Sequence, residues 1–105
     1  MDQNTIDEGK TMAIISYIFT PIGLLIAYLM NNDKNNAFAK FHIGQSVRLA
    51  ILGAANYALE RILPHTIDFI SSFINLGILV LMILGIINAV NGKTKKLPII
   101  GEIGE

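Results

Sequence analysis

The chain of 105 residues contains no cysteine, and its basic and acidic residues are equal in number at eight each. Without cysteine it forms no disulfide and offers neither a thiolate ligand for a metal nor a thiol nucleophile. Because the sequence has two histidines, His42 and His65, a dedicated metal site is not expected. A formal net charge of zero gives no electrostatic reason to expect a nucleic-acid partner.

Motifs for common cofactors and catalytic sites are also missing. The sequence has no Gly-rich phosphate loop, GxSxG elbow, HExxH helix or paired-cysteine motif. Glu60, His65 and Asp68 lie close in sequence and include acid and base types, but nothing in their spacing holds them together. We expect them to be solvated loop charges. The sequence therefore predicts a protein that is not an enzyme and binds no cofactor.

Apolar side chains are abundant. Hydrophobic residues make up 52% of the sequence and charged residues 15%. A soluble protein of this length leaves much of its surface exposed, so this composition would form sticky patches in water, whereas lipid solvates the same side chains. The sequence predicts an integral membrane protein with a single domain over residues 1–105.

Two segments are long and apolar enough to cross a bilayer. Residues 11–30 carry no charge and, at about 1.5 Å per residue, can cover a hydrocarbon core of about 30 Å. A cleaved signal peptide is the rival interpretation, but acidic rather than basic residues precede this run, and it exceeds an ordinary signal-peptide core. Residues 67–90 are the most apolar stretch of the chain.

A third segment, residues 41–63, is weaker because polar and charged residues interrupt it: Gln45, Arg48, Asn56, Glu60 and Arg61. Pro64 disfavours a helical conformation at Leu63 and so marks its end. The expected fold class is all-α, a polytopic membrane protein built as a bundle of three transmembrane helices. A connector covers 31–42 and a tail covers 91–105, in which the apolar residues 97–100 are expected to rest on the membrane interface.

The positions of lysine and arginine set the predicted orientation. Three crossings place the N-terminus and the 60–68 turn on one side, and the connector and tail on the other. The first side holds Lys10 and Arg61, whereas the second holds Lys34, Lys40, Lys93, Lys95 and Lys96. By the positive-inside rule, the connector and tail are cytoplasmic and the N-terminus lies outside the inner (plasma) membrane.

Small residues recur at helical spacing in the first and third segments, and each set falls on one side of its helix. Small side chains let helices approach closely in lipid, where close packing replaces the hydrophobic drive. Ordinary helix packing is favoured over a ligand groove as the role of these small residues. The alternative that two copies of the chain dimerise through either set is left open. The expected packing residues are Ala13, Ser16, Thr20, Gly23 and Ala27 in the first segment and Gly77, Gly85 and Asn88 in the third.

A polar face runs along the second segment. At about 100° per residue, His42, Gln45, Ser46 and Asn56 share one side of the helix, and Arg48 lies near its edge. Polar side chains are costly in hydrocarbon, so this face must look into the bundle, toward a partner chain or onto a water-filled cavity. A polar conduit or recognition surface is one interpretation. An interhelical hydrogen-bond network, with Arg48 as a snorkelling anchor, is the other.

Two motifs carry a family resemblance: FHIGQS at residues 41–46 and GIINAVNGKTKKLPIIGEI at residues 85–103. With the apolar first segment and its polar connector, they resemble the small bacterial membrane proteins grouped with the twenty-kilodalton channel subunit of the chloroplast inner-envelope protein-import translocon. The resemblance implies a helical membrane protein, associated in plants with moving proteins across a membrane. It brings no catalytic residues. Its most specific positions here are His42, Gln45, Asn88, Asn91, Gly92, Lys93, Leu97 and Pro98.

The expected function is that of a small non-enzymatic integral membrane protein, a helical subunit or scaffold of a membrane complex related to protein translocation. The alternative is an oligomeric channel or transporter with a polar pathway along the second segment. A membrane-embedded enzyme ranks last because no nucleophile and base pair is recognisable. The expected partners are the lipid bilayer and other membrane proteins or a second copy of the chain.

Overall fold

The computed structural model describes residues 1–18 and 22–102, and helices dominate this part of the chain. No strand occurs in the described ranges, so the predicted all-α class is confirmed, but the helices outnumber the three expected. In chain order the elements are α1 (Gln3–Tyr17), α2 (Ile22–Lys34), α3 (Ala37–Ile62), the short 3-10 helix η1 (His65–Ile67) and α4 (Asp68–Val90).

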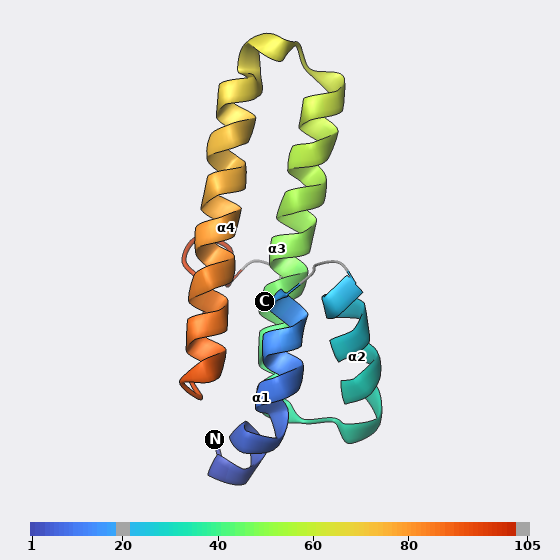
Figure 1. The fold of residues 1–105 in the computed structure, drawn as a ribbon, viewed down its shortest axis with the longest axis vertical. Coiled ribbons are helices and arrows are strands. Elements are labelled where there is room, and N and C mark those ends of the chain that lie inside the picture. The colour runs from blue at the N-terminus through green and yellow to red at the C-terminus, as the bar shows by residue number, and fades with distance from the viewer. Residues whose placement is uncertain (19–21, 103–105) are drawn as a thin grey trace.

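The prediction of one continuous helix over residues 11–30 is wrong, because the structure divides this segment between α1 and α2. Helix α1 ends at Tyr17, and the backbone of the next residue, Ile18, is extended. Pro21 gives a chemical reason for the interruption, since it has no amide hydrogen to donate to the carbonyl of Tyr17. With 15 and 13 residues, α1 and α2 are each about 20 Å long and fold back on each other as a hairpin (Figure 1).

Helices α3 and α4 form a second, longer hairpin. Their boundaries lie close to the predicted segments 41–63 and 67–90. With 26 and 23 residues, they measure about 39 Å and about 34 Å. Their far ends, joined through η1, extend well beyond α1 and α2 (Figure 1), and the molecule measures 50 × 23 × 23 Å.

The N-terminal helix, the connector and the end of α4 meet at one end of the molecule (Figure 1). Asn36 Nδ2 donates to the carbonyl of Thr5 at 2.8 Å, and Ile6 and Lys10 lie beside Gly92. Three alternating crossings would have placed the N-terminus opposite the connector. The predicted arrangement with the N-terminus outside therefore does not fit this fold, because the α1–α2 hairpin returns the chain to the side on which it began.

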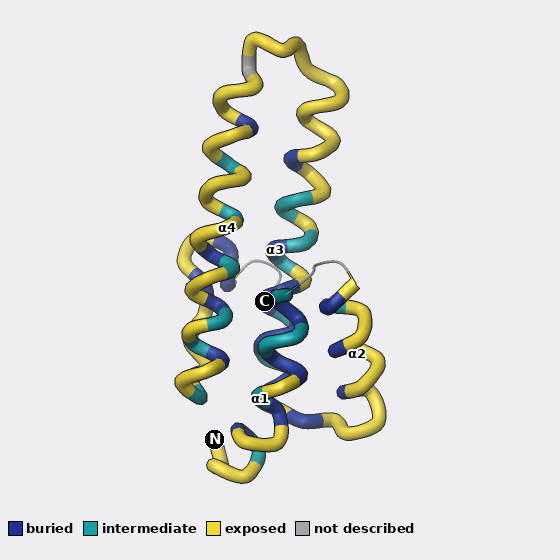
Figure 2. Tube along the Cα trace, in the orientation of Figure 1, coloured by how far each residue is buried: buried dark blue, intermediate teal, exposed yellow. Residues whose placement is uncertain are grey.

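The hydrophobic core lies where α1 and α2 pack against the halves of α3 and α4 nearest the termini (Figure 2). Tyr17 and Phe38 are among its largest fully buried side chains. Leu97 and Ile100 of the C-terminal tail join the same core, at 3% and 4% exposure. The expectation that residues 97–100 rest on the membrane interface is wrong for these two side chains, because the tail packs on the bundle instead.

The C-terminal tail reaches the core because the chain reverses at the end of α4. Gly92 has a φ of +70°, a left-handed conformation that glycine adopts without steric cost. The amide of Lys93 donates to the carbonyl of Asn88 at 2.8 Å, which completes a Schellman-type cap. This turn directs residues 93–102 back along α3.

Apolar side chains remain exposed over much of the α3–α4 hairpin (Figure 2), including Ile62, Phe69 and Phe73 at 79%, 63% and 70%. Within the described residues, α4 alone is long and apolar enough to cross a membrane, and only 17% of its most apolar window is buried. Helix α3 is longer, but its polar residues make it less apolar than a membrane-spanning helix of that length needs to be. The structure thus supports one spanning helix by length and composition, not the three predicted.

The hairpin of α1 and α2 predicts whether replacing Gly23 with alanine stabilises or destabilises the protein. A Cβ there would overlap the carbonyl oxygens of Ile15 and Ile18, so we expect Gly23→Ala to destabilise the protein by about 1–3 kcal/mol. In a continuous helix, the same change would stabilise it by up to about 1 kcal/mol. Thermal unfolding in detergent measures the difference.

Gly77→Ala is the matched control, because a Cβ on that glycine of α4 meets nothing within 4 Å. We expect it to leave the melting temperature unchanged or raise it slightly. A Gly23→Ala variant as stable as Gly77→Ala would contradict the hairpin.

Candidate functional site

His42 links three parts of the chain from a fully buried position on α3. Its Nε2 lies 2.8 Å from the carbonyl oxygen of Lys93, which only accepts hydrogen bonds, so Nε2 carries the ring proton. Its Nδ1 then accepts from the hydroxyl of Tyr17 at 2.8 Å. The neutral imidazole thereby joins α1 to the C-terminal tail, and the rings of Phe38 and Phe41 pack edge-on against it.

Gln45, one turn further along α3, holds the tail at two points. Its Oε1 accepts from the amide of Leu97 at 2.8 Å, and its Nε2 donates to the carbonyl of Gly101 at 3.2 Å. The side chain is 2% exposed, so both its oxygen and its nitrogen are satisfied without water. His42 and Gln45 together account for three polar backbone groups of the tail, whose described residues, 91–102, form turns and irregular chain.

Ser46 closes the network toward α1. Its hydroxyl donates to the carbonyl of Ser16, near the end of α1 where backbone carbonyls lack partners within the helix. The hydroxyl of Ser16 donates in turn to the carbonyl of Ala13 at 2.6 Å. Both serines are fully buried, so the end of α1 is anchored inside the molecule.

Asn36 organises the connector, which is shorter than the predicted range 31–42 because α2 runs to Lys34 and α3 starts at Ala37. Its Oδ1 caps α3 by accepting from the amide of Ala39 at 3.0 Å. The backbone amide of Asn36 donates to Asn31 Oδ1 at 2.8 Å. Asn36 is 7% exposed and fixes both the start of α3 and, through Thr5, the start of α1.

Asn56 joins α3 to α4 in the part of the hairpin beyond α1 and α2. Its Nδ2 donates to Asn75 Oδ1 at 2.8 Å and to the carbonyl of Ser71 at 3.2 Å. The hydroxyl of Ser71 donates to the carboxylate of Glu60. Interhelical polar bonds of this kind hold helices together in lipid, where apolar contact alone gives little drive.

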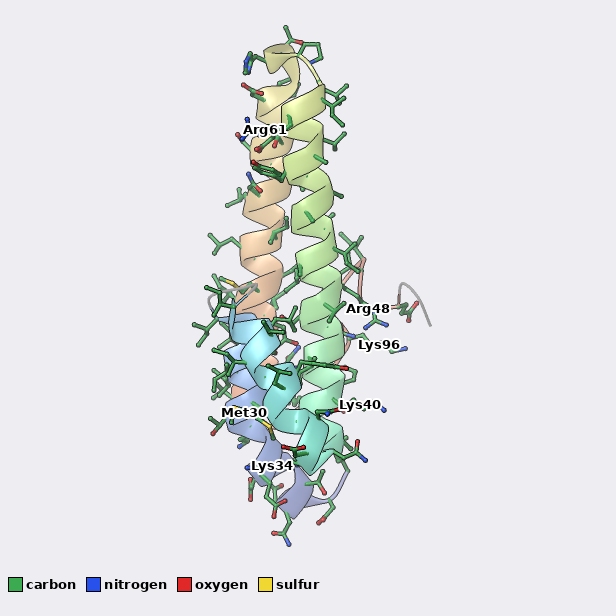
Figure 3. The ribbon with its side chains drawn as sticks, turned by 90° about the vertical axis from the view of Figure 1, so that its right-hand side faces the viewer. Met30, Lys34, Lys40, Arg48, Arg61 and Lys96 are labelled. Atoms are coloured by element: carbon green, nitrogen blue, oxygen red, sulfur yellow. The ribbon has the colours of Figure 1, made fainter. Side chains whose placement is uncertain are left out.

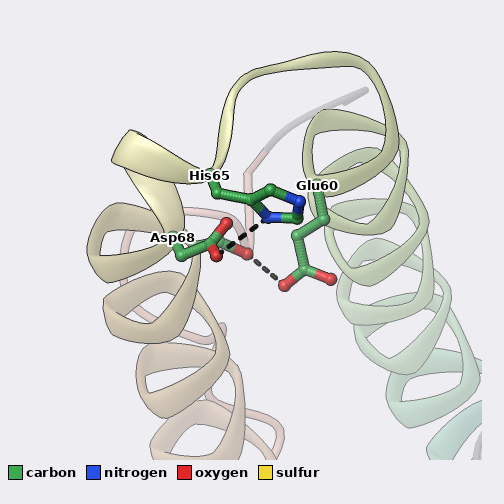
Figure 4. A network of polar contacts seen from close by, with 4 residues as sticks. Glu60, His65 and Asp68 are labelled. Atoms are coloured by element: carbon green, nitrogen blue, oxygen red, sulfur yellow. Dashed lines mark hydrogen bonds and ion pairs between the residues drawn. The ribbon is translucent and has the colours of Figure 1, made fainter.

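Glu60, His65 and Asp68 lie together at the tip of this hairpin (Figure 4). His65 Nδ1 lies 3.3 Å from Asp68 Oδ2, with side-chain exposures of 96% and 58%. Such exposed pairs contribute little to stability, and water competes for each group. All three are exposed residues at a turn, and Glu60 accepts hydrogen bonds from Ser71 and Asn75 of α4.

Arg48 is half-buried at the edge of the polar face. One of its terminal nitrogens, Nη1, lies 3.4 Å from the place where a Cβ on Gly44 would sit. The guanidinium therefore reaches one turn back along α3, toward the start of that helix and the connector. This is the direction of a snorkelling side chain.

The expected packing residues differ in how far they are buried. Ala13, Ser16, Gly23, Ala27 and Gly85 are buried, and Gly85 lies directly against the ring of Tyr17. Asn88 is half-buried, and Thr20 lies outside the described residues. Gly77 is exposed, and a Cβ placed on it meets nothing of this chain within 4 Å, so its expected packing role stays a prediction.

Two partners of the polar face were not predicted, namely Tyr17 and the backbone of residues 93–101. The role of Asn36 in the connector was not predicted either. Asn36 had a usable signal, because an asparagine directly before a helical pattern is a favoured N-cap. Tyr17 has a hydroxyl within an aliphatic run, which is a weaker signal. Nothing in the composition of the tail indicates that its backbone would bond to α3.

The fold and this network define a small all-helical protein with a polar interior and an apolar outer hairpin, as expected of a helical membrane protein. Two curated proteins of Methanocaldococcus jannaschii are similar to it. UPF0132 membrane protein MJ1443 is 33% identical over 103 residues, which cover 95% of this chain and 87% of the relative. UPF0132 membrane protein MJ1527 is 31% identical over 96 residues, or 88% of this chain and 64% of the relative.

The chain therefore belongs to the UPF0132 family of membrane proteins. No family model and no solved structure matches it. The relatives' names agree with the predicted membrane location. Neither name refers to protein import and both relatives are archaeal, so the link to the import translocon and the bacterial inner membrane stay predictions.

Gln45 provides a test of the tail attachment. Gln45→Leu removes the partners of the Leu97 amide and the Gly101 carbonyl, so we expect the tail to detach and the protein to lose about 1–3 kcal/mol of stability. Trypsin cleavage after Lys95 and Lys96 should then accelerate. Val47→Ala, at an exposed neighbouring position, is the control. Equal cleavage rates in the two variants would contradict the attachment.

Proposed function

We propose that this protein is a multi-pass membrane protein in which the α3–α4 hairpin crosses the bilayer and the α1–α2 hairpin enters it from one side only. The observation that carries this proposal is the exposed apolar surface of α4. Helices α3 and α4 are each longer than a hydrocarbon core of about 30 Å, whereas α1 and α2 are each about 20 Å long. Apolar surface of this extent is stable in lipid and not in water.

The distribution of cations supports an orientation with the N-terminal helix and the connector on the cytoplasmic side. The α3–α4 turn carries Arg61, next in sequence to Glu60, and Asp68. The half of the molecule away from this turn carries the lysines of α1, α2, the start of α3 and the tail, which are Lys10, Lys34, Lys40, Lys93, Lys95 and Lys96. The positive-inside rule favours the lysine-rich end on the cytoplasmic side.

We further propose a non-enzymatic role as a helical subunit or scaffold of a membrane complex. The polar face of α3 supports this role, because His42, Gln45 and Ser46 bond to this chain's own backbone and side chains rather than to a pathway. The exposed apolar hairpin offers a surface for lipid or for neighbouring helices. The resemblance to the import-translocon grouping suggests a complex that moves or assembles proteins.

Cysteine labelling tests the membrane arrangement. Since the chain has no cysteine, single replacements at Glu8, Asn32 and His65 each report one exposed position. In intact cells we expect a membrane-impermeant maleimide to label His65→Cys and to leave Glu8→Cys and Asn32→Cys unlabelled until the membrane is opened. Labelling of both Glu8→Cys and His65→Cys in intact cells would support the three-crossing arrangement predicted from the sequence. It would contradict the proposal.

Ion flux separates the scaffold from an oligomeric channel. In proteoliposomes, we expect monovalent-ion flux at the level of empty vesicles, because the polar side chains of α3 nearest the termini are engaged internally. The control is the Arg48→Leu variant, which should behave identically. Flux well above that of empty vesicles that Arg48→Leu abolishes would contradict the scaffold and favour the channel.

A further inference from the structure

A continuous groove follows one side of α3 and changes character along its length. Its apolar part, of about 470 Å³, lies beside Val47, Ile51, Leu52 and Ala55, with Ile100 of the tail at its edge. Its polar part, of about 410 Å³, lies between α2 and α3. Gly44 and Val47 line both parts, so the two adjoin each other.

The polar part of the groove offers hydrogen-bonding groups beside the end of α2 and the start of α3. It is lined by the hydroxyl-bearing Tyr28, by Lys40 and by asparagines that include Asn32 of α2 and Asn35 of the connector. Each of these residues is exposed, so their polar groups reach the surface. This end of the groove can bind a polar group, whereas the other part is lined mainly by apolar side chains.

Cations stand at the junction of the two parts. Lys40 lines the polar part and Arg48 the apolar part, and they are the charged residues among the described side chains that line the groove. The guanidinium of Arg48 reaches back over Gly44 toward the polar part. Lys40, Arg48 and Lys96 project from the same side of the ribbon in Figure 3. The site therefore attracts an anion at the point where its lining changes from polar to apolar.

We propose that this groove binds one anionic phospholipid, with an acyl chain along Val47, Ile51 and Ala55 and the phosphate group near Lys40 and Arg48. The inference rests on the proposed membrane arrangement, in which the polar part lies at the cytoplasmic interface. Basic pockets between helices at that level suit anionic headgroups. A second copy of the chain would bring the same cations to this face, and like charges would repel.

Native mass spectrometry of the full chain in detergent tests the site with two probes, phosphatidylglycerol and phosphatidylcholine carrying identical acyl chains. We expect one phosphatidylglycerol to remain bound, with an affinity about tenfold or more above that of phosphatidylcholine because two cations contribute. Lys40→Gln and Arg48→Gln should each weaken phosphatidylglycerol binding about fivefold. Lys34→Gln, on α2 and outside the lining, should leave it unchanged.

A second pair of variants tests the apolar part. Ala55→Phe fills the groove and should reduce binding of both lipids, whereas Ala54→Phe, an exposed neighbour outside the lining, should not. If Arg48→Gln fails to fold, the exposed Lys40 and Ala55 still report on the site.

Equal binding of the two lipids, or loss of binding in Lys34→Gln and Lys40→Gln alike, would overturn the lipid site. The cysteine-labelling experiment tests the membrane arrangement without depending on lipid binding. Non-selective binding with the labelling pattern intact would refute the lipid site alone, whereas an altered pattern would refute the membrane arrangement on which it rests.

Discussion

The structure depends on the need to satisfy polar side chains that α3 buries in an apolar fold. His42, Gln45 and Ser46 are each at most 2% exposed, and an unpaired polar group at such positions costs about 1–3 kcal/mol. Their partners come from distant parts of the chain: the end of α1 and the backbone of the tail. The same bonds therefore satisfy α3, anchor α1 and determine the path of residues 93–101.

Beyond this network, the described part of the molecule consists of the outer parts of α3 and α4, joined through η1. These parts contact each other through Asn56, Ser71 and Asn75, and much of their surface is exposed (Figure 2) and apolar. A polar interior in one half and an apolar hairpin in the other are consistent with the proposal that the hairpin crosses a membrane. Arg48, whose guanidinium points toward the polar end, fits the boundary between the two regions.

Local sequence signals predicted the elements well where each signal acts alone. Pro64 marked the end of α3. The division of residues 11–30 was missed because the prediction rested on apolar length. The signals for the division are Pro21, which has no amide hydrogen, and the tight approach that Gly23 permits. Polarity alone identified the buried face of α3, but its partners lie far away in sequence, and no local rule predicts such pairings.

The most direct test of this account is a distance between spin labels at Asn4→Cys and Ala37→Cys in a bilayer, two exposed positions beside the contact of Thr5 with Asn36. A second pair, Ala37→Cys with His65→Cys, calibrates the length of α3 at about 40 Å. The account predicts that the first distance is far shorter than a hydrocarbon core of about 30 Å. A first distance as long as that core or longer would contradict it.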